Sequence, residues 1–189
     1  MREKIEKHIE LRQRLLDRLR TEPKLFSASE VMQAAIQAGN KIMTCGNGGS
    51  ATQASHFAAE LVNRLYRDRQ ALPALCLNDN TANITSIAND SDFRWIFSRQ
   101  IEALGIPGDV LLALTTGGES KNILEALARA HRSGLKTICL CGSRTDKVRR
   151  AGTDMLISID ATDTPAVQEM HLFLLHVMAD LIEQNLTRS

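Results

Sequence analysis

The sequence lacks several features that would assign a protein to a class at once. Its 23 lysines and arginines nearly balance its 22 aspartates and glutamates, so the formal charge of +1 shows neither the basic excess typical of nucleic-acid binding nor an acidic tail. No apolar run approaches the ~18 residues of a membrane span. The charged residues 1–13 have no apolar core of the kind that a signal peptide needs. We therefore expect a cytoplasmic protein that binds neither nucleic acid nor membrane.

Cysteine is scarce, and no two cysteines form a CxxC pair. Cys45, Cys76, Cys139 and Cys141 each lie in or beside an apolar run that is typical of a strand. This placement argues against a cysteine–zinc site or a disulfide. It favours buried free thiols in a reducing compartment.

Repeats, low-complexity tracts and linkers rich in proline or glycine are also missing. The chain is therefore expected to form a single domain over residues 1–189, with 43% hydrophobic residues to fill its core. Strands are predicted at residues 41–46, 71–77, 109–115, 135–141 and 154–159. Helices are predicted at residues 1–22, 27–39, 50–64, 82–88, 93–104, 120–131 and 165–186. This alternation predicts a three-layer α/β sandwich with a parallel sheet, whose ligands bind beyond the carboxyl ends of the strands.

Two glycine-rich turns follow predicted strands and open predicted helices. The first, CGNGGS at residues 45–50, is neither GxGxxG nor a P-loop, which disfavours a nucleotide, but its backbone N–H groups suit an anion or a sugar oxygen. The second, TTGGES at residues 115–120, sets the hydroxyls of Thr115, Thr116 and Ser120 beside flexible backbone, as a phosphate site without a counter-cation requires. The alternatives are plain strand-to-helix turns and, for Ser120, a helix N-cap. Two such turns at two strand ends favour a ligand site.

Titratable side chains occur at helical spacing in two places. His56 and Glu60 are four residues apart, which suits two ligands of one metal, a carboxylate that orients an imidazole, or a simple surface pair. His171 and His176 lie three and eight residues after Gln168 in an apolar stretch, where a histidine is more often a core residue. The spacing alone leaves these alternatives open.

Five blocks in order resemble one family, the sedoheptulose-7-phosphate (phosphoheptose) isomerases of the SIS fold. The blocks are CGNGGS, HFAAEL followed by Arg64, AND at residues 88–90, TTGGES, and QEMH followed by His176, and they cover nearly the whole chain. The resemblance implies an aldose–ketose isomerase that converts sedoheptulose 7-phosphate to D-glycero-D-manno-heptose 7-phosphate through an enediol, for surface-glycan heptose. It also implies a homotetramer with active sites between subunits, in which residues 1–22 form a helix used in assembly.

Matching positions carry the family's site residues onto this chain. The resemblance implies one divalent ion, usually zinc, held by His56, Glu60, Gln168 and His176. It implies that Glu60 is the base and that His176 is the partner acid or base. The implied substrate contacts are Asn47, Gly48, Gly49, Ser50, Glu60, Arg64, Asn89, Asp90, Thr115, Thr116, Gly117, Ser120 and Gln168.

Three departures and one distance set this chain apart from the family's pattern. Gly117 stands where the family usually has a phosphate-binding serine, and Glu119 replaces a neutral residue, so its carboxylate would repel a phosphate unless it points away. Residues 165–166 are Pro-Ala where family members often carry Asp-Arg. Eight helical residues rise about 12 Å, so Gln168 and His176 would both have to lean towards one shared ion.

Two alternative functions follow from these departures. One is a non-catalytic SIS protein similar to the initiator-associating protein that binds the replication initiator DnaA. The other is an isomerase or sensor for another sugar phosphate. The non-catalytic protein lacks the acid and the histidine at the positions of Glu60 and His176, and this chain keeps both. The sequence therefore favours an enzyme.

Overall fold

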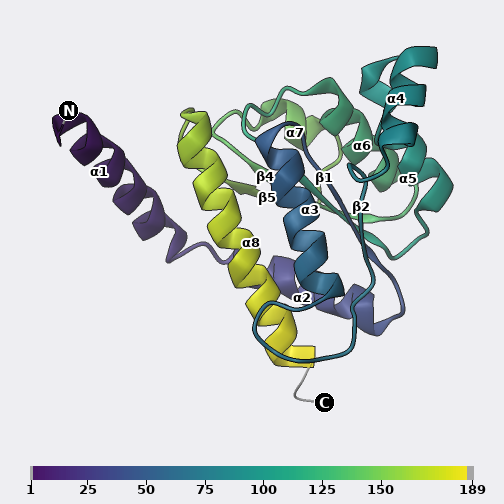
Figure 1. Cartoon of the computed structure of the whole chain (residues 1–189), viewed down its shortest axis with the longest axis horizontal. Helices are drawn as coiled ribbons and strands as arrows, with labels where there is room; N and C mark the ends of the chain where they lie inside the picture. The colour runs from purple at the N-terminus through teal and green to yellow at the C-terminus, as the bar shows by residue number, and fades with distance from the viewer. Residues whose placement is uncertain (1, 187–189) are drawn as a thin grey trace.

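The computed structural model describes residues 2–186, in which one five-stranded parallel sheet lies between two layers of helices (Figure 1). All neighbouring strands are parallel. The order across the sheet is β2 (Ala74–Cys76), β1 (Ile42–Cys45), β3 (Val110–Thr115), β4 (Lys136–Cys141) and β5 (Met155–Ser158). The predicted α/β sandwich with a parallel sheet is confirmed.

Helices cover both faces of this sheet. One face is covered by α2 (Lys24–Gln37), α3 (Gly49–Val62) and α8 (Thr164–Leu186). The other face is covered by α4 (Thr81–Asp90), the 3-10 turn η1 (Phe93–Trp95), α5 (Ser98–Leu104), α6 (Lys121–Arg132) and α7 (Asp146–Arg150). Helices α3 and α8 lie side by side, and this pair carries the site described below (Figure 1).

Alternate residues of each strand supply two separate cores. Ile42 and Leu112 pack under α3 and α8, whereas Met43 and Leu111 pack under α5 and α6. Because both faces are covered, every residue of β1 and β3 is buried. Strands buried on both faces form continuous apolar runs in the sequence, which is why the pattern predicted them.

The predicted elements differ from the structure mainly at three places. Helix α2 begins at Lys24, earlier than residue 27, directly after Pro23, whose ring fixes φ near the helical value at −67°. Residues 93–104 form η1 and a separate α5 instead of one helix. Helix α7 is absent from the predicted elements, because its five residues are too few for an apolar stripe to repeat at helical spacing.

The first helix, α1 (Arg2–Leu19), projects away from the body of the molecule (Figure 1). Its Arg12 reaches Glu169 on α8, with Nη2 2.8 Å from Oε1. Near the other end of the helix, Leu15 and Leu19 are buried. Ile5 and Ile9 are 54% and 49% exposed, so the outer half of α1 presents an apolar stripe.

The four cysteines are buried free thiols, as predicted. Within residues 2–186, no helix combines the length and the apolar character of a membrane span.

The topological switch point of the sheet, where the strand order changes direction, lies between β1 and β3. The chain passes from β1 to β2 on one side and then returns to form β3 on the other side. The two glycine turns, at residues 45–50 and 115–120, leave the carboxyl ends of these adjacent strands. Ligands of open α/β sheets bind at such a reversal, so the fold brings the two turns to one crevice.

Candidate functional site

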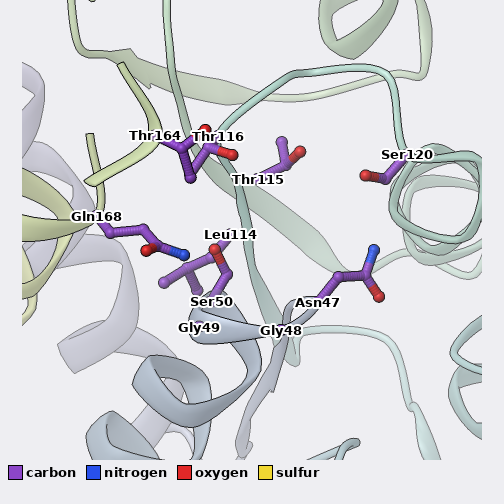
Figure 2. A pocket seen from close by; sticks show the side chains of 10 residues that line it. All are labelled: Asn47, Gly48, Gly49, Ser50, Leu114, Thr115, Thr116, Ser120, Thr164 and Gln168. Carbon is purple, nitrogen blue, oxygen red and sulfur yellow. The ribbon is translucent and has the colours of Figure 1, made fainter. Parts of the chain in front are cut away.

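A cavity of about 320 Å³ opens between the two glycine turns and the start of α8 (Figure 2). Neutral side chains and backbone line it, with hydroxyls and amides around the opening. The lining residues are Asn47, Gly48, Gly49, Ser50, Leu114, Thr115, Thr116, Ser120, Thr164 and Gln168. Neutral donors at a helix N-terminus suit a phosphate or a sugar hydroxyl.

Close packing at the first turn requires glycine. Gly48 has a φ of +54°, a left-handed conformation that residues with a Cβ rarely adopt. A Cβ on Gly49 would overlap the side-chain amide of Gln168. The start of α8 therefore closes the cavity against the start of α3. Gln53 reinforces this contact, because its Nε2 donates to the Gln168 carbonyl at 2.7 Å.

A reciprocal amide pair joins the two turns. Asn47 Nδ2 donates to Asn122 Oδ1 at 2.8 Å, and Asn122 Nδ2 donates to Asn47 Oδ1 at 2.7 Å. Asn122 lies in the first turn of α6 and is 2% exposed. The pair holds the Asn47 side chain at the edge of the cavity.

The second turn is anchored on the side facing α7. Gly118 has a φ of +66°, and a Cβ there would overlap the carbonyl oxygen of Arg144. Glu119 points away from the cavity, with its carboxylate 2.8 Å from Lys147 Nζ and 3.2 Å from Arg144 Nη1. The hydrogen bond from Lys147 and the nearby Arg144 lower the pKa of Glu119 below its usual value. The two cations thus neutralise the charge that was expected to repel a phosphate.

A cluster of three titratable side chains lies between α3 and α8. His56 Nε2 and His176 Nε2 are 3.1 Å apart. Glu60 Oε1 lies 3.0 Å from the first of these nitrogens and 3.4 Å from the second. The two imidazoles are half-exposed, whereas the Glu60 side chain is 8% exposed. Burial raises the pKa of Glu60, although both imidazoles act in the opposite direction.

The cluster fits a divalent metal ion. A tetrahedral zinc with bonds of about 2.0–2.2 Å holds its ligand atoms about 3.3–3.6 Å apart, close to the 3.0–3.4 Å found here. When the Nε2 atoms of two neutral imidazoles face each other, they form a hydrogen bond only if one Nε2 carries the proton and the other accepts it. A cation between them binds the lone pairs of both nitrogens. Glu60 Oε2 is buried and makes no hydrogen bond within the described residues. His56, Glu60 and His176 therefore form a candidate metal site.

Comparison with known proteins matches the sequence of this chain to one family. The model of the SIS domain matches residues 7–142. A phosphoheptose isomerase of Rhodospirillum rubrum is 43% identical over 164 residues, 87% of each chain. One from Nitratiruptor is 39% identical over 187 residues, 98% of this chain and 100% of that one. This chain belongs to the SIS-domain family and, within it, to the phosphoheptose isomerases.

Solved structures of the family share the whole architecture. The phosphoheptose isomerase GmhA of Neisseria gonorrhoeae superimposes with a TM-score of 0.89 at 34% identity, covering 97% of this chain and 98% of that one. The phosphoheptose isomerase of Francisella tularensis gives a TM-score of 0.91 at 32% identity, covering 96% and 97%.

Helix α8 separates the three side chains that the sequence left ambiguous. Gln168 lines the cavity, and His176 joins the cluster two turns further on. His171 is fully buried in the core, where burial lowers its pKa to about 4 and the Cys141 backbone offsets only part of the effect. Neither ring nitrogen of His171 forms a hydrogen bond of good geometry with the described residues. The spacing left open whether His171 is a ligand or a core residue, and the structure shows that it is a core residue.

Three of the family's substrate positions lie outside the cavity of this chain. Arg64 is exposed beyond the end of α3, with Nη1 3.8 Å from Asp68 Oδ1. Asn89 and Asp90 are exposed at the end of α4, joined by a hydrogen bond of 2.8 Å. A fourth implied position, Gly117, directly follows the cavity-lining Thr116; it is exposed, and a Cβ there would have nothing within 4 Å.

Sequence reasoning missed several residues around the site. Leu114 and Thr164 line the cavity, and Asn122 holds Asn47. Leu114 belongs to a buried strand and gave no polar signal. Asn122 ends the block TTGGESKN, and its position in the first turn of α6, beside the strand-end crevice, could have drawn attention to it.

Proposed function

We propose that this chain catalyses the isomerisation of sedoheptulose 7-phosphate to D-glycero-D-manno-heptose 7-phosphate. The observation that carries the proposal is the convergence of Glu60, His56 and His176 beside a neutral, hydroxyl-lined cavity. Family membership supplies the substrate class, because the relatives at about 40% identity are phosphoheptose isomerases.

The chemistry needs a base and a partner that moves hydroxyl protons. Glu60 removes a proton from C1 of the ketose while O2 is protonated, which gives the enediol. The proton on O1 then leaves and C2 is protonated, which gives the aldose. Burial makes Glu60 a stronger base, because it raises the pKa of the carboxyl. His176, whose Nε2 lies 3.4 Å from Glu60 Oε1, is the proposed partner that moves the hydroxyl proton. When Nε2 holds the metal, Nδ1 is the ring nitrogen left to carry that proton.

Zinc is the proposed resident ion, held by His56, Glu60 and His176. Gln168, the proposed fourth ligand, lies with its side-chain amide against Gly49 at the cavity and would have to turn towards the cluster to reach the ion. Bound at the cluster, the ion would polarise the substrate oxygens that become the enediol oxygens. The nitrogen and carboxylate donors suit zinc.

The spacing along α3 suits a long sugar phosphate. Ser50 at the cavity and His56 at the cluster are six residues apart, a rise of about 9 Å. A seven-carbon chain with bonds of about 1.5 Å extends on the order of 8 Å. The phosphate would rest against Thr115, Thr116 and Ser120 while C1 and C2 reach the cluster.

We further propose that the chain, a single SIS domain over residues 1–189, acts in the cytoplasm as a homotetramer with active sites between subunits. The exposed Ile5 and Ile9 of α1 support a role of that helix in assembly. In such an assembly Arg64, Asn89 and Asp90 would contact substrate bound to a neighbouring subunit.

The test is turnover of sedoheptulose 7-phosphate by the pure protein, with and without a chelator, followed by aldose formation. We expect turnover that the chelator abolishes and added zinc restores. Fructose 6-phosphate serves as a shorter control and should react poorly. Absence of turnover under every condition, together with tight binding to the initiator DnaA, would favour the non-catalytic alternative. Turnover of a different phosphosugar alone would favour another isomerase.

A further inference from the structure

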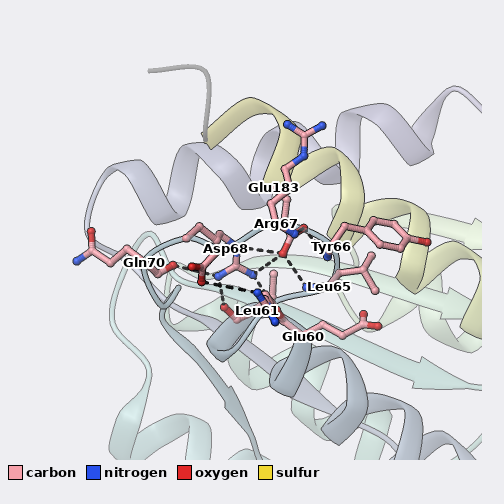
Figure 3. Close-up of polar contacts among 10 residues, drawn as sticks. Glu60, Leu61, Leu65, Tyr66, Arg67, Asp68, Gln70 and Glu183 are labelled. Carbon is pink, nitrogen blue, oxygen red and sulfur yellow. Dashed lines mark hydrogen bonds and ion pairs between the residues drawn. The ribbon is translucent and has the colours of Figure 1, made fainter.

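A buried carboxylate on α8, that of Glu183, binds backbone N–H groups of the loop that follows α3 (Figure 3). Glu183 is fully buried and accepts hydrogen bonds from three consecutive backbone N–H groups, those of Leu65 at 2.7 Å, Tyr66 at 3.0 Å and Arg67 at 3.1 Å. Burial would raise the pKa of Glu183, but these donors and Arg69 outweigh it and lower the pKa. The group is therefore a carboxylate at neutral pH.

Arg69 connects this carboxylate to the end of α3. Its guanidinium, 5% exposed, lies 3.2 Å from Glu183 Oε1. It also donates to the carbonyl of Glu60 at 2.7 Å and to that of Leu61 at 2.8 Å. The last carbonyls of a helix have no partner within it, so Arg69 caps α3 at the residue that supplies the cluster's carboxylate.

Helices α3 and α8 are thus joined at two points. At the cluster, Glu60 Oε1 faces His176 Nε2 at 3.4 Å. Glu183 lies seven residues after His176, two turns along the same face of α8 and about 10 Å away. Sliding of one helix along the other would change the cluster distances, and metal sites tolerate about 0.5 Å. A buried ion pair is a weak source of net stability, which points to a role in fixing position.

We propose that Glu183 and Arg69 are positioning residues that set the separation of Glu60 and His176, and thereby the metal affinity of the cluster and the rate of the chemical step. The inference rests on the proposed function, since it concerns the same metal cluster.

The experiment compares Glu183→Gln and Arg69→Lys with the wild type. Zinc affinity is measured by competition with a chelating dye, thermal stability is measured on metal-free protein, and kcat and KM are measured with the heptose phosphate. We expect zinc affinity to fall about 10- to 100-fold, as for other outer groups that orient metal ligands. We expect kcat to fall with KM little changed, because the phosphate cavity lies at the opposite end of α3.

Ile182→Val is the matched control. Ile182 is fully buried on the same helix next to Glu183, and the substitution removes one methyl-sized group while it keeps the ion pair. The control should melt at a lower temperature and bind zinc like the wild type.

Zinc affinity and kcat of the wild type in Glu183→Gln, or changes no larger than those in Ile182→Val, would overturn the inference. If Glu183→Gln does not fold, Arg69→Lys decides in the same way, because the three backbone N–H groups still hold Glu183 there. A wild-type protein that neither binds zinc nor turns over would instead overturn the proposed function, and the inference with it.

Discussion

The cavity and the cluster lie along the same helix pair but are built from opposite kinds of group. The cavity is lined by backbone, hydroxyls and amides that do not titrate. The cluster consists of groups that do, His56, Glu60 and His176. The cavity takes its shape from glycine turns at two neighbouring strand ends, whereas the cluster depends on how α3 packs against α8. Under the proposed function, binding and proton transfer are separated in space, and substitutions should divide into those that change KM and those that change kcat.

The largest effect is expected for Glu60→Gln. The amide keeps the size of the side chain but cannot accept the proton from C1, so kcat should fall by about 10²–10⁴-fold. KM should change little and the circular dichroism spectrum should stay the same. Glu30→Gln, at an exposed position on α2, is the control and should leave both constants alone. A rate near that of the wild type in Glu60→Gln would remove this residue from the mechanism.

Local features of the sequence predicted the cavity well. A glycine turn after a buried strand needs only a few adjacent residues, so the strand ends and their hydroxyls could be read directly. Ser50, Thr115 and Ser120 all line the cavity. The same local reading could not decide between His171 and His176, because both lie in one apolar stretch. Only the packing of α8 against α3 and the sheet turns one into the core and the other towards Glu60.

Contacts between distant segments lay beyond the sequence. Glu183 is one acid near the end of an apolar helix, and nothing near it in sequence marks Arg69 as its partner, 114 residues away. Likewise, the family pattern does not say that Glu119 faces Lys147, which removes the expected repulsion. Such pairs depend on tertiary packing.

The second prediction tests whether His171 is chemically silent, unlike the histidines of the cluster. Its folded pKa of about 4 lies below the unfolded value of about 6.5, so the unfolded chain binds the extra proton between these values. Protonation of His171 in the unfolded chain therefore lowers the unfolding free energy by about 3 kcal/mol as the pH falls from 6.5 to 4. His171→Leu should lose that part of the acid sensitivity in urea titrations across this range.

The control for this experiment is Met178→Leu, which alters another fully buried position of α8 without removing a titratable group and should keep the wild-type pH slope. The fold also loses stability in acid through Asp109 and Glu183, because both carboxyls have a lowered pKa in the folded state. The difference in unfolding free energy between variant and wild type is therefore the quantity to measure. An unchanged slope in His171→Leu would contradict the assignment.

The third prediction concerns the rigidity of the cavity. Gly118→Ala should lower the unfolding free energy by about 2 kcal/mol, because the left-handed φ of +66° disfavours a Cβ and the Arg144 carbonyl occupies its space. The displaced turn should also raise KM more than it lowers kcat. Gly117→Ala is the neighbouring control, with open space around its Cβ, and should be close to neutral. Equal melting temperatures for the two variants would mean that the turn adapts freely.

The smallest effect, and the finest test of the comparison, is expected for Gly117→Ser. The open space at residue 117 accepts a hydroxyl, which would restore the phosphate contact that the family usually has. One added hydrogen bond contributes about 1 kcal/mol net, so KM should fall roughly five-fold while kcat stays the same. Steady-state kinetics beside Gly117→Ala separates the hydroxyl from the added Cβ. A change in kcat with KM constant would show that the second turn acts on the chemical step, and the separation between cavity and cluster would then fail.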